Sequence, residues 1–233
     1  MQRYSYSMLR KSITLLCDQS DSFFLNHITK AQEIVEKFGY NFDFINDKSR
    51  IKSGYILFAA AARSILSSEE LSKHEFNVVL HPSKLPQYRG SGVVAWSILD
   101  GASELWVTSF IATKELDLGP IVWQSSRNLN GLELMDEIRA LQAELFLEHI
   151  NYVLGLEKIT GTPQERGKSS QVYRRRSQED SRLDIEESLG SQFNLLRTVD
   201  NLRYPAFFDF NGERFYLFIS KKQDFTQKSS SNE

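Results

Sequence analysis

Short apolar runs alternate with a helical segment over the first part of this sequence, and this alternation constrains the fold more than any other feature. Residues 13–17, 41–45 and 56–60 are apolar, β-rich runs. Between the first two, residues 23–38 carry apolar side chains at helical spacing and stop at Gly39. Strand–helix–strand alternation is typical of βαβ units. We therefore expect an α/β, Rossmann-like fold with a mainly parallel sheet and flanking helices.

The remainder of the chain has further strand and helix patterns. Strands are expected at residues 78–80 and 106–112, helices at 68–73, 93–99, 132–154 and 188–199, and a polar loop at 155–171. Near the end, Asn211-Gly212 separates two alternating apolar runs. Because Asn-Gly between such runs favours a tight turn, we expect a small C-terminal helix and β-hairpin appendage.

Two of the expected strands end in residues that can perform acid–base chemistry. The run at 78–80 leads directly into His81, and the run at 106–112 is followed closely by Asp117. Open α/β sheets bind their ligands at the ends of strands. Histidine exchanges a proton near neutral pH, and a carboxylate can orient its ring. We expect the pair to form one site; the alternative is a core histidine and an unrelated turn aspartate.

Two motifs around this pair resemble those of a known family. They read His-Pro-Ser-x-Leu-Pro-x-x-x-Gly over residues 81–90 and Glu-Leu-Asp-x-Gly-x-Ile over residues 115–121. Their sequences and separation are similar to those of formyltransferases that use 10-formyltetrahydrofolate, and the likeness covers most of residues 12–124. Residues 173–208 are similar to the sugar N-formyltransferases of the type associated with pseudaminic acid pathways.

The resemblance implies a transferase of one-carbon groups that acts in surface polysaccharide biosynthesis. It would move a formyl group from the co-substrate 10-formyltetrahydrofolate to the amine of a nucleotide-linked amino-sugar. His81 would take a proton from that amine or hydrogen-bond the oxyanion. Asp117 would set the tautomer and protonation of the ring and assist proton transfer to the leaving nitrogen. We expect no metal, because the sequence has no cluster of ligands for one.

Matching to the family also implies the binding residues and the domain limits. The folate is expected to contact Ser64, Leu66, Ala112, Thr113, Lys114 and Asp117. For the acceptor we expect Ser83, the glycine-containing loop with Arg89 and Gly90, and Tyr204; that loop could equally be a solvated turn. The expected domains are a formyltransferase catalytic domain at 1–160, a C-terminal subdomain at 172–221 and a disordered tail at 222–233.

One expected part of the family site is missing. The family places an asparagine two residues before the histidine as an oxyanion donor, and here that position is Val79. Loss of one such donor lowers the rate by roughly 100- to 1000-fold. Asn77 lies about 13 Å along the strand from His81 and cannot substitute. We expect a backbone N–H or Ser83 to supply the donor; the alternatives are that the subfamily accepts the loss or that the protein is not a catalyst.

The composition of the chain limits the kinds of partner that we expect it to bind. The net charge is −2, with 28 Lys and Arg against 30 Asp and Glu, so there is no positive field for nucleic acid. The one cysteine, Cys17, suits a reducing cytoplasm. No stretch approaches the ~20 apolar residues of a membrane span. We expect a cytoplasmic protein with small-molecule partners, either a monomer capped by the C-terminal hairpin or a homodimer built through it.

Two other functions stay open at the level of sequence. The chain could formylate an aminoacyl or peptidyl amine instead of an amino-sugar. It could also be an inactive folate- or nucleotide-sugar-binding module, although retention of both His81 and Asp117 argues against this.

Overall fold

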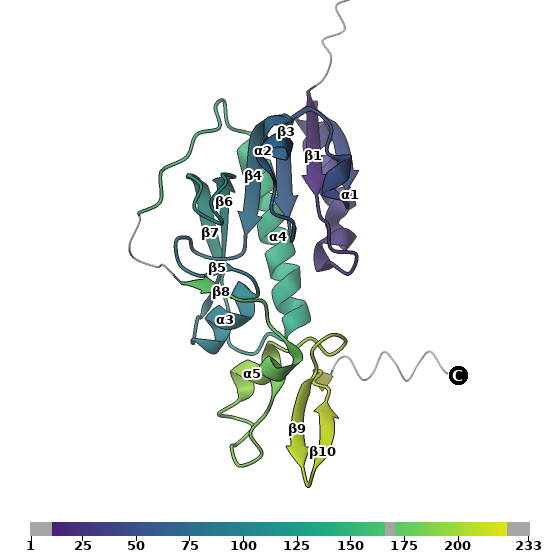
Figure 1. Cartoon of the computed structure of the whole chain (residues 1–233), viewed down its shortest axis with the longest axis vertical. Coiled ribbons are helices and arrows are strands. Elements are labelled where there is room, and N and C mark those ends of the chain that lie inside the picture. The colour runs from purple at the N-terminus through teal and green to yellow at the C-terminus, as the bar shows by residue number, and fades with distance from the viewer. Residues whose placement is uncertain (1–10, 166–170, 223–233) are drawn as a thin grey trace, which may run out of the picture.

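The computed structural model describes residues 11–165 and 171–222, and its centre is a six-stranded mixed sheet (Figure 1). The strand order is β2-β1-β3-β4-β6-β7. These strands are β1 (Ser12–Leu16), β2 (Asn41–Ile45), β3 (Gly54–Ala60), β4 (His74–His81), β6 (Glu104–Ile111) and β7 (Ile121–Asn128). The first four are parallel, whereas β6 runs antiparallel to β4, and β7 antiparallel to β6. The α/β, Rossmann-like expectation is confirmed.

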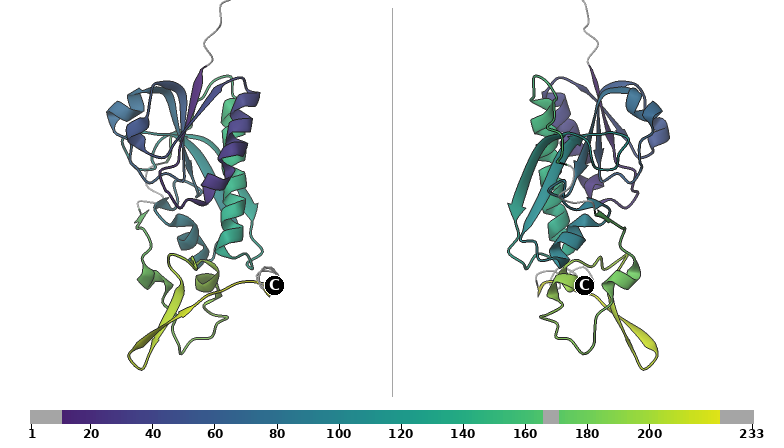
Figure 2. Two further views of the ribbon diagram at one scale, coloured as in Figure 1. Left: turned by 90° about the vertical axis from the view of Figure 1, so that its right-hand side faces the viewer. Right: turned by 60° about the vertical axis from the view of Figure 1, so that its left-hand side comes forward.

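Helices cover both faces of this sheet. Figure 2 shows α1 (Ile28–Lys37) and α4 (Met135–Leu154) side by side on one face, with α2 (Ser68–Ser72) on the other. The remaining helical elements are η1 (Phe23–His27), η2 (Lys48–Arg50), α3 (Val93–Leu99), η3 (Gln178–Ser181) and α5 (Phe193–Arg197). Two short pairs, β5 (Arg89–Gly90) with β8 (Val172–Tyr173) and β9 (Ala206–Phe210) with β10 (Glu213–Leu217), complete the fold.

Alternate residues of β4 face opposite sides of the sheet. Val78 and Leu80 pack into the main core with Phe146 of α4. Val79 packs into a smaller cluster that contains Leu66. Because side chains alternate along a strand, His81 shares the face of Val79. At the end of β4, His81 therefore lies on one face of the sheet, and Val78 and Leu80 pack toward α4 on the other.

The C-terminal residues form a separate small layer beyond the ends of β1, β3 and β4 (Figure 1). Asn211 and Gly212 both have positive φ, 50° and 87°, as a two-residue hairpin turn of the mirror-image kind requires. The expected hairpin is therefore confirmed. Buried Arg197 of α5 holds this layer to the start of α4, because its guanidinium donates to the Glu133 carbonyl at 3.3 Å.

Several boundaries differ from the sequence-based expectation. The helix expected at 188–199 is wrong in length, since only Phe193–Arg197 is helical. Ser188 Oγ accepts from the Ser191 backbone N–H at 3.0 Å, and this local bond favours a turn over a helix. β7 was not expected at all. The tail expected at 222–233 lies outside the described residues except for residue 222.

Within residues 11–165 and 171–222, no helix combines the length and hydropathy needed to cross a bilayer. The same residues contain no group of three or more His, Cys, Asp or Glu side chains that could hold a metal ion.

His149 of α4 is buried in a way that links stability to pH. Its ring is 0 % exposed, hydrogen-bonds Ser125 Oγ at 3.0 Å and lies 4.3 Å from the Trp123 ring centroid. Burial lowers the pKa of His149 to about 3. In the unfolded chain the pKa is about 6.5. The unfolded state therefore binds a proton as the pH falls below about 6.5 while the folded state does not, and stability falls.

We predict that this group alone removes about 2 kcal/mol from the free energy of unfolding between pH 7.5 and pH 5. Urea unfolding at both pH values, for the wild-type chain and for His149→Gln, measures the effect. Glutamine can keep a hydrogen bond to Ser125 but does not titrate, so the variant should lose about 2 kcal/mol less over this range. Equal losses in the two proteins would contradict the prediction.

Candidate active site

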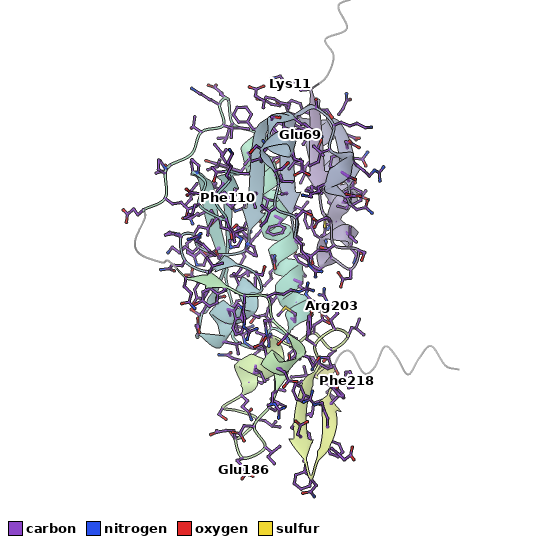
Figure 3. The ribbon with its side chains drawn as sticks, viewed as in Figure 1. Lys11, Glu69, Phe110, Glu186, Arg203 and Phe218 are labelled. Carbon is purple, nitrogen blue, oxygen red and sulfur yellow. The ribbon has the colours of Figure 1, made fainter. Side chains whose placement is uncertain are left out.

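A cavity of about 660 Å³ opens where the C-terminal ends of β1, β3 and β4 meet the C-terminal layer. In Figure 3, Phe110 marks its wall beside the sheet and Arg203 its wall beside the lower end of α4. His81 and Asp117 both line it. The two residues that the sequence places at strand ends therefore do reach one cavity.

His81 ends β4 and is held by the loop that follows it. The ring is 6 % exposed, and its Nε2 lies 2.8 Å from the backbone carbonyl of Tyr88. A carbonyl can only accept, so Nε2 carries the hydrogen and Nδ1 of the neutral ring is free to take a proton. The tautomer is therefore set by Tyr88. This differs from the expectation that Asp117 would set it.

Asp117 lies beside the other ring nitrogen. Its Oδ1 is 3.8 Å from His81 Nδ1, too far for a hydrogen bond but close enough to stabilise a positive charge on the ring. Its Oδ2 accepts the Gly90 backbone N–H at 2.8 Å. The carboxylate is 8 % exposed. The pair can thus accept one proton at Nδ1 and hold the resulting imidazolium against a fixed negative charge.

The turn that carries Asp117 is fixed by three features. Asp117 itself adopts a left-handed conformation with φ 54°. Gln164 donates from its side-chain amide to the carbonyls of Asp117 and Gly119, at 3.0 and 2.8 Å. At Gly119 an added Cβ would lie 1.7 Å from the Ile111 carbonyl oxygen, so only glycine fits. Gln164 lies in the polar loop expected at 155–171, and no motif in that loop predicted this role.

One arm of the cavity lies on the face of Val79 and Leu66. All the residues expected to contact folate line the cavity: Ser64, Leu66, Ala112, Thr113, Lys114 and Asp117. The backbone N–H groups of Arg63 and Ser64 donate to the Asp18 carboxylate, at 2.7 and 2.9 Å, which fixes that segment. Asp18 was not expected to have this function.

The other arm lies between α4 and the C-terminal layer. Asp200 accepts from Arg139 of α4 at 2.7 Å and from Arg203 at 2.6 Å, and Arg203 also pairs with Asp21 at 2.8 Å. Burial alone would raise the pKa of Asp200, but the two arginines hold it well below its usual range. Tyr204, expected at the acceptor, lines this arm. Gly90, also expected there, lines the cavity beside Asp117.

Two residues expected at the acceptor are directed elsewhere. Ser83 is 4 % exposed and its Oγ donates to the Gln87 carbonyl at 2.9 Å. Arg89 donates from Nε and Nη2 to the Leu116 carbonyl, at 3.2 and 2.8 Å. Neither side chain lines the cavity. Both hold the loops around His81 and Asp117 because their donors are used within the protein.

Fold and site together define an α/β protein with a proton-transfer pair at the junction of a two-armed cavity. Comparison with known proteins shows which family the central part of the chain matches. Residues 39–150 match the family described as Formyl transferase. This stretch of the chain therefore has the formyl transferase domain, and the protein is a formyltransferase.

Solved structures with the same fold have low sequence identity to this chain. A methionyl-tRNA formyltransferase from Clostridium thermocellum is 19 % identical with a TM-score of 0.76, and the match covers 91 % of this chain and 94 % of that one. A sugar N-formyltransferase from a Shewanella species is 16 % identical with a TM-score of 0.65, covering 91 % and 98 %. HypX from Aquifex aeolicus in complex with tetrahydrofolic acid is 17 % identical with a TM-score of 0.68, covering 90 % and 38 %.

The contacts of Ser83 predict what its removal does. Ser83→Ala should lower the free energy of unfolding by about 1 kcal/mol, because the hydrogen bond from the buried Ser83 hydroxyl to the Gln87 carbonyl is lost. It should change kcat by less than about 3-fold, whereas loss of an oxyanion donor lowers the rate by roughly 100-fold or more. Steady-state formylation and urea unfolding measure the two effects. As a reference, His81→Ala removes the proton acceptor and should abolish transfer.

A fall of 100-fold in kcat for Ser83→Ala with unchanged stability would restore Ser83 as the oxyanion donor.

Proposed function

We propose that this chain transfers a formyl group from 10-formyltetrahydrofolate to the primary amine of a nucleotide-linked amino-sugar. The observation that carries the proposal is the two-armed cavity with the His81–Asp117 pair at its junction. A transferase with two substrates needs both reacting atoms beside one proton acceptor, and this arrangement supplies that geometry.

His81 performs the proton transfer in this proposal. As the acceptor amine bonds to the formyl carbon, Nδ1 takes a proton from the amine nitrogen, and Asp117 at 3.8 Å stabilises the imidazolium. The bond between the formyl carbon and the folate nitrogen then breaks, and that nitrogen takes up the proton. Val79 presents only methyl groups to the cavity and cannot donate, whereas the Nδ1–H of the charged His81 ring can donate to the developing oxyanion.

The arm on the face of Leu66 fits the flat pterin ring of a folate. Ala62, Leu66 and Val79 provide small apolar surface there. The backbone groups of Leu66 and Lys114 form no hydrogen bond to another residue within the described ranges. Unpaired backbone donors and acceptors at an apolar slot are what the polar edge of a heterocycle requires. The likeness to a folate-bound HypX structure supports the same co-substrate.

The charges in the other arm favour an anionic acceptor. Arg139 and Arg203 are both paired with Asp200. Arg175 lines the same arm, and the contact its guanidinium makes there is a hydrogen bond to the Tyr204 hydroxyl at 3.3 Å. Arg175 has no carboxylate partner among the residues that the structure describes. A guanidinium without a carboxylate partner is well suited to phosphate, which supports a nucleotide-linked acceptor.

A substrate panel tests the proposed function. Purified full-length chain is incubated with 10-formyltetrahydrofolate and nucleotide-linked amino-sugars, the matching free amino-sugars or methionyl-tRNA, and formylated product is measured by mass spectrometry. We expect turnover with a nucleotide-linked amino-sugar. Turnover with methionyl-tRNA alone would overturn the sugar assignment. Folate binding without turnover on any amine would overturn catalysis.

Arg175 provides a second prediction. Arg175→Ala should raise KM for the nucleotide-linked acceptor by about 10-fold, because a charge-assisted contact to phosphate is lost. The kcat, and the KM for folate, should change by less than about 3-fold. Lys30→Ala on α1 is the matched control, since it removes one exposed positive charge that lies outside the cavity. An equal effect of the two variants on KM would contradict the role of Arg175.

A further inference from the structure

Gln142 on α4 lines the cavity, and its side-chain amide has no hydrogen-bond partner among the described residues. Its side chain is 6 % exposed and lines the cavity, yet it forms no hydrogen bond with any residue in the described ranges. Other amides near the site are paired: Gln19 donates to the Ala61 carbonyl at 2.8 Å, and Gln124 to the Leu85 carbonyl at 2.9 Å. The amide atoms of Gln142 are not among the fully buried polar atoms that lack a partner, so they border the open space of the cavity. The amide of Gln142 is therefore available to a ligand.

Gln142 lies on α4 between Arg139, which is part of an ion-pair network, and the apolar side chain of Phe146. Arg139, Gln142 and Phe146 follow one another at helical spacing on the face of α4 that lines the cavity. Phe146 packs against Phe24 with ring centroids 5.5 Å apart. Arg139 is already bound to Asp200 at 2.7 Å. Gln142 is therefore the uncommitted polar group between an apolar wall and a neutralised ion-pair network.

The two core clusters, one on each face of the sheet, show which arm of the cavity Gln142 lines. Phe146, one turn further along α4, packs into the same core cluster as Leu80. Leu66 and Val79, which line the arm that fits a folate, pack into the cluster on the opposite face. A group beside Phe146 therefore faces the arm between α4 and the C-terminal layer, where the acceptor would lie.

We infer that Gln142 hydrogen-bonds the uncharged, hydroxyl-bearing part of the acceptor and selects for it; this inference rests on the proposed function. A carboxamide offers both an acceptor oxygen and an N–H donor, which matches a hydroxyl or an acylated amine on a sugar ring. It carries no charge, so it does not compete with Arg175 for phosphate. A site that pairs a buried amide with a substrate hydroxyl rejects analogues that lack the hydroxyl.

The test compares Gln142→Leu with Glu144→Leu in the full-length chain. Leucine at 142 keeps the approximate size and the helix propensity but removes both hydrogen-bonding groups. Glu144 lies on the exposed side of the same helix, so its replacement introduces the same side chain outside the cavity. For Gln142→Leu we expect KM for the amino-sugar acceptor to rise by about 10- to 100-fold. The kcat and the folate dissociation constant should change by less than about 3-fold, and Glu144→Leu should leave all three unchanged.

A thermal measurement separates ligand recognition from a structural role. Since Gln142 makes no hydrogen bond within the described residues, leucine breaks no internal bond, and the melting temperature of ligand-free Gln142→Leu should stay at that of the wild type. A fall in melting temperature, or an unchanged acceptor KM in an active variant, would overturn the inference alone. A wild-type chain that formylates no amino-sugar would instead overturn the proposed function, and the two failures are therefore distinct.

Discussion

The antiparallel pairing of β4 with β6 is the interaction on which the rest of the site depends. It sets His81 opposite Thr108 and Val78 opposite Ile111, so β6 ends well past the level of the histidine. The chain must then return to enter β7, and the Ile111 N–H bond to the Pro120 carbonyl at 2.9 Å closes that return. Residues 112–120 leave the sheet beside the middle of β4, where the Ala112 N–H donates to the Asn77 carbonyl at 2.7 Å, and the Asp117 side chain in this loop lies beside the His81 ring. Asp117 reaches the imidazole because the sheet changes from parallel to antiparallel here.

The C-terminal layer completes the second arm through charge pairing rather than through a large apolar interface. Arg197 binds the start of α4 from within the layer, and Asp200 binds Arg139 further along the same helix. Arg203 extends the network to Asp21 in the turn after β1. Partly buried charges are stable when each one has a partner, and these are paired. Among the described residues of this arm, Arg175 has no carboxylate partner and the Gln142 amide has no hydrogen-bond partner, so both can contact a ligand.

The sequence was sufficient for the parts of the fold that local patterns determine. The parallel strands, the Asn211-Gly212 hairpin and the long helix α4 were all expected, because apolar periodicity and turn residues specify them directly. β7 was missed because its residues are half-buried and include polar Ser125 and Ser126, so neither strict alternation nor an apolar run appears. The helix at 188–199 was overestimated because side-chain bonds of serine compete with helical ones.

The candidate site was less predictable because its contacts join residues distant in sequence. His81 and Asp117 could be placed from strand ends and motifs. The role of the Tyr88 carbonyl in holding the ring could not, since any residue has a carbonyl. Ser83 was expected at the substrate, yet its hydroxyl is used by the loop around the cis peptide bond before Pro86. Gln142 gave no signal in sequence, because an amide on the core side of a helix looks the same whether it is paired or free.

The central claim is that two substrates approach His81 Nδ1 from two arms of one cavity. A crystal structure of the chain with a non-transferable folate analogue and an amino-sugar acceptor tests it most directly. The account predicts the heterocycle against Leu66, the sugar against α4, and the amine within about 3.5 Å of both His81 Nδ1 and the position of the formyl carbon. Both ligands in one arm, or an amine that lies away from the imidazole, would contradict it.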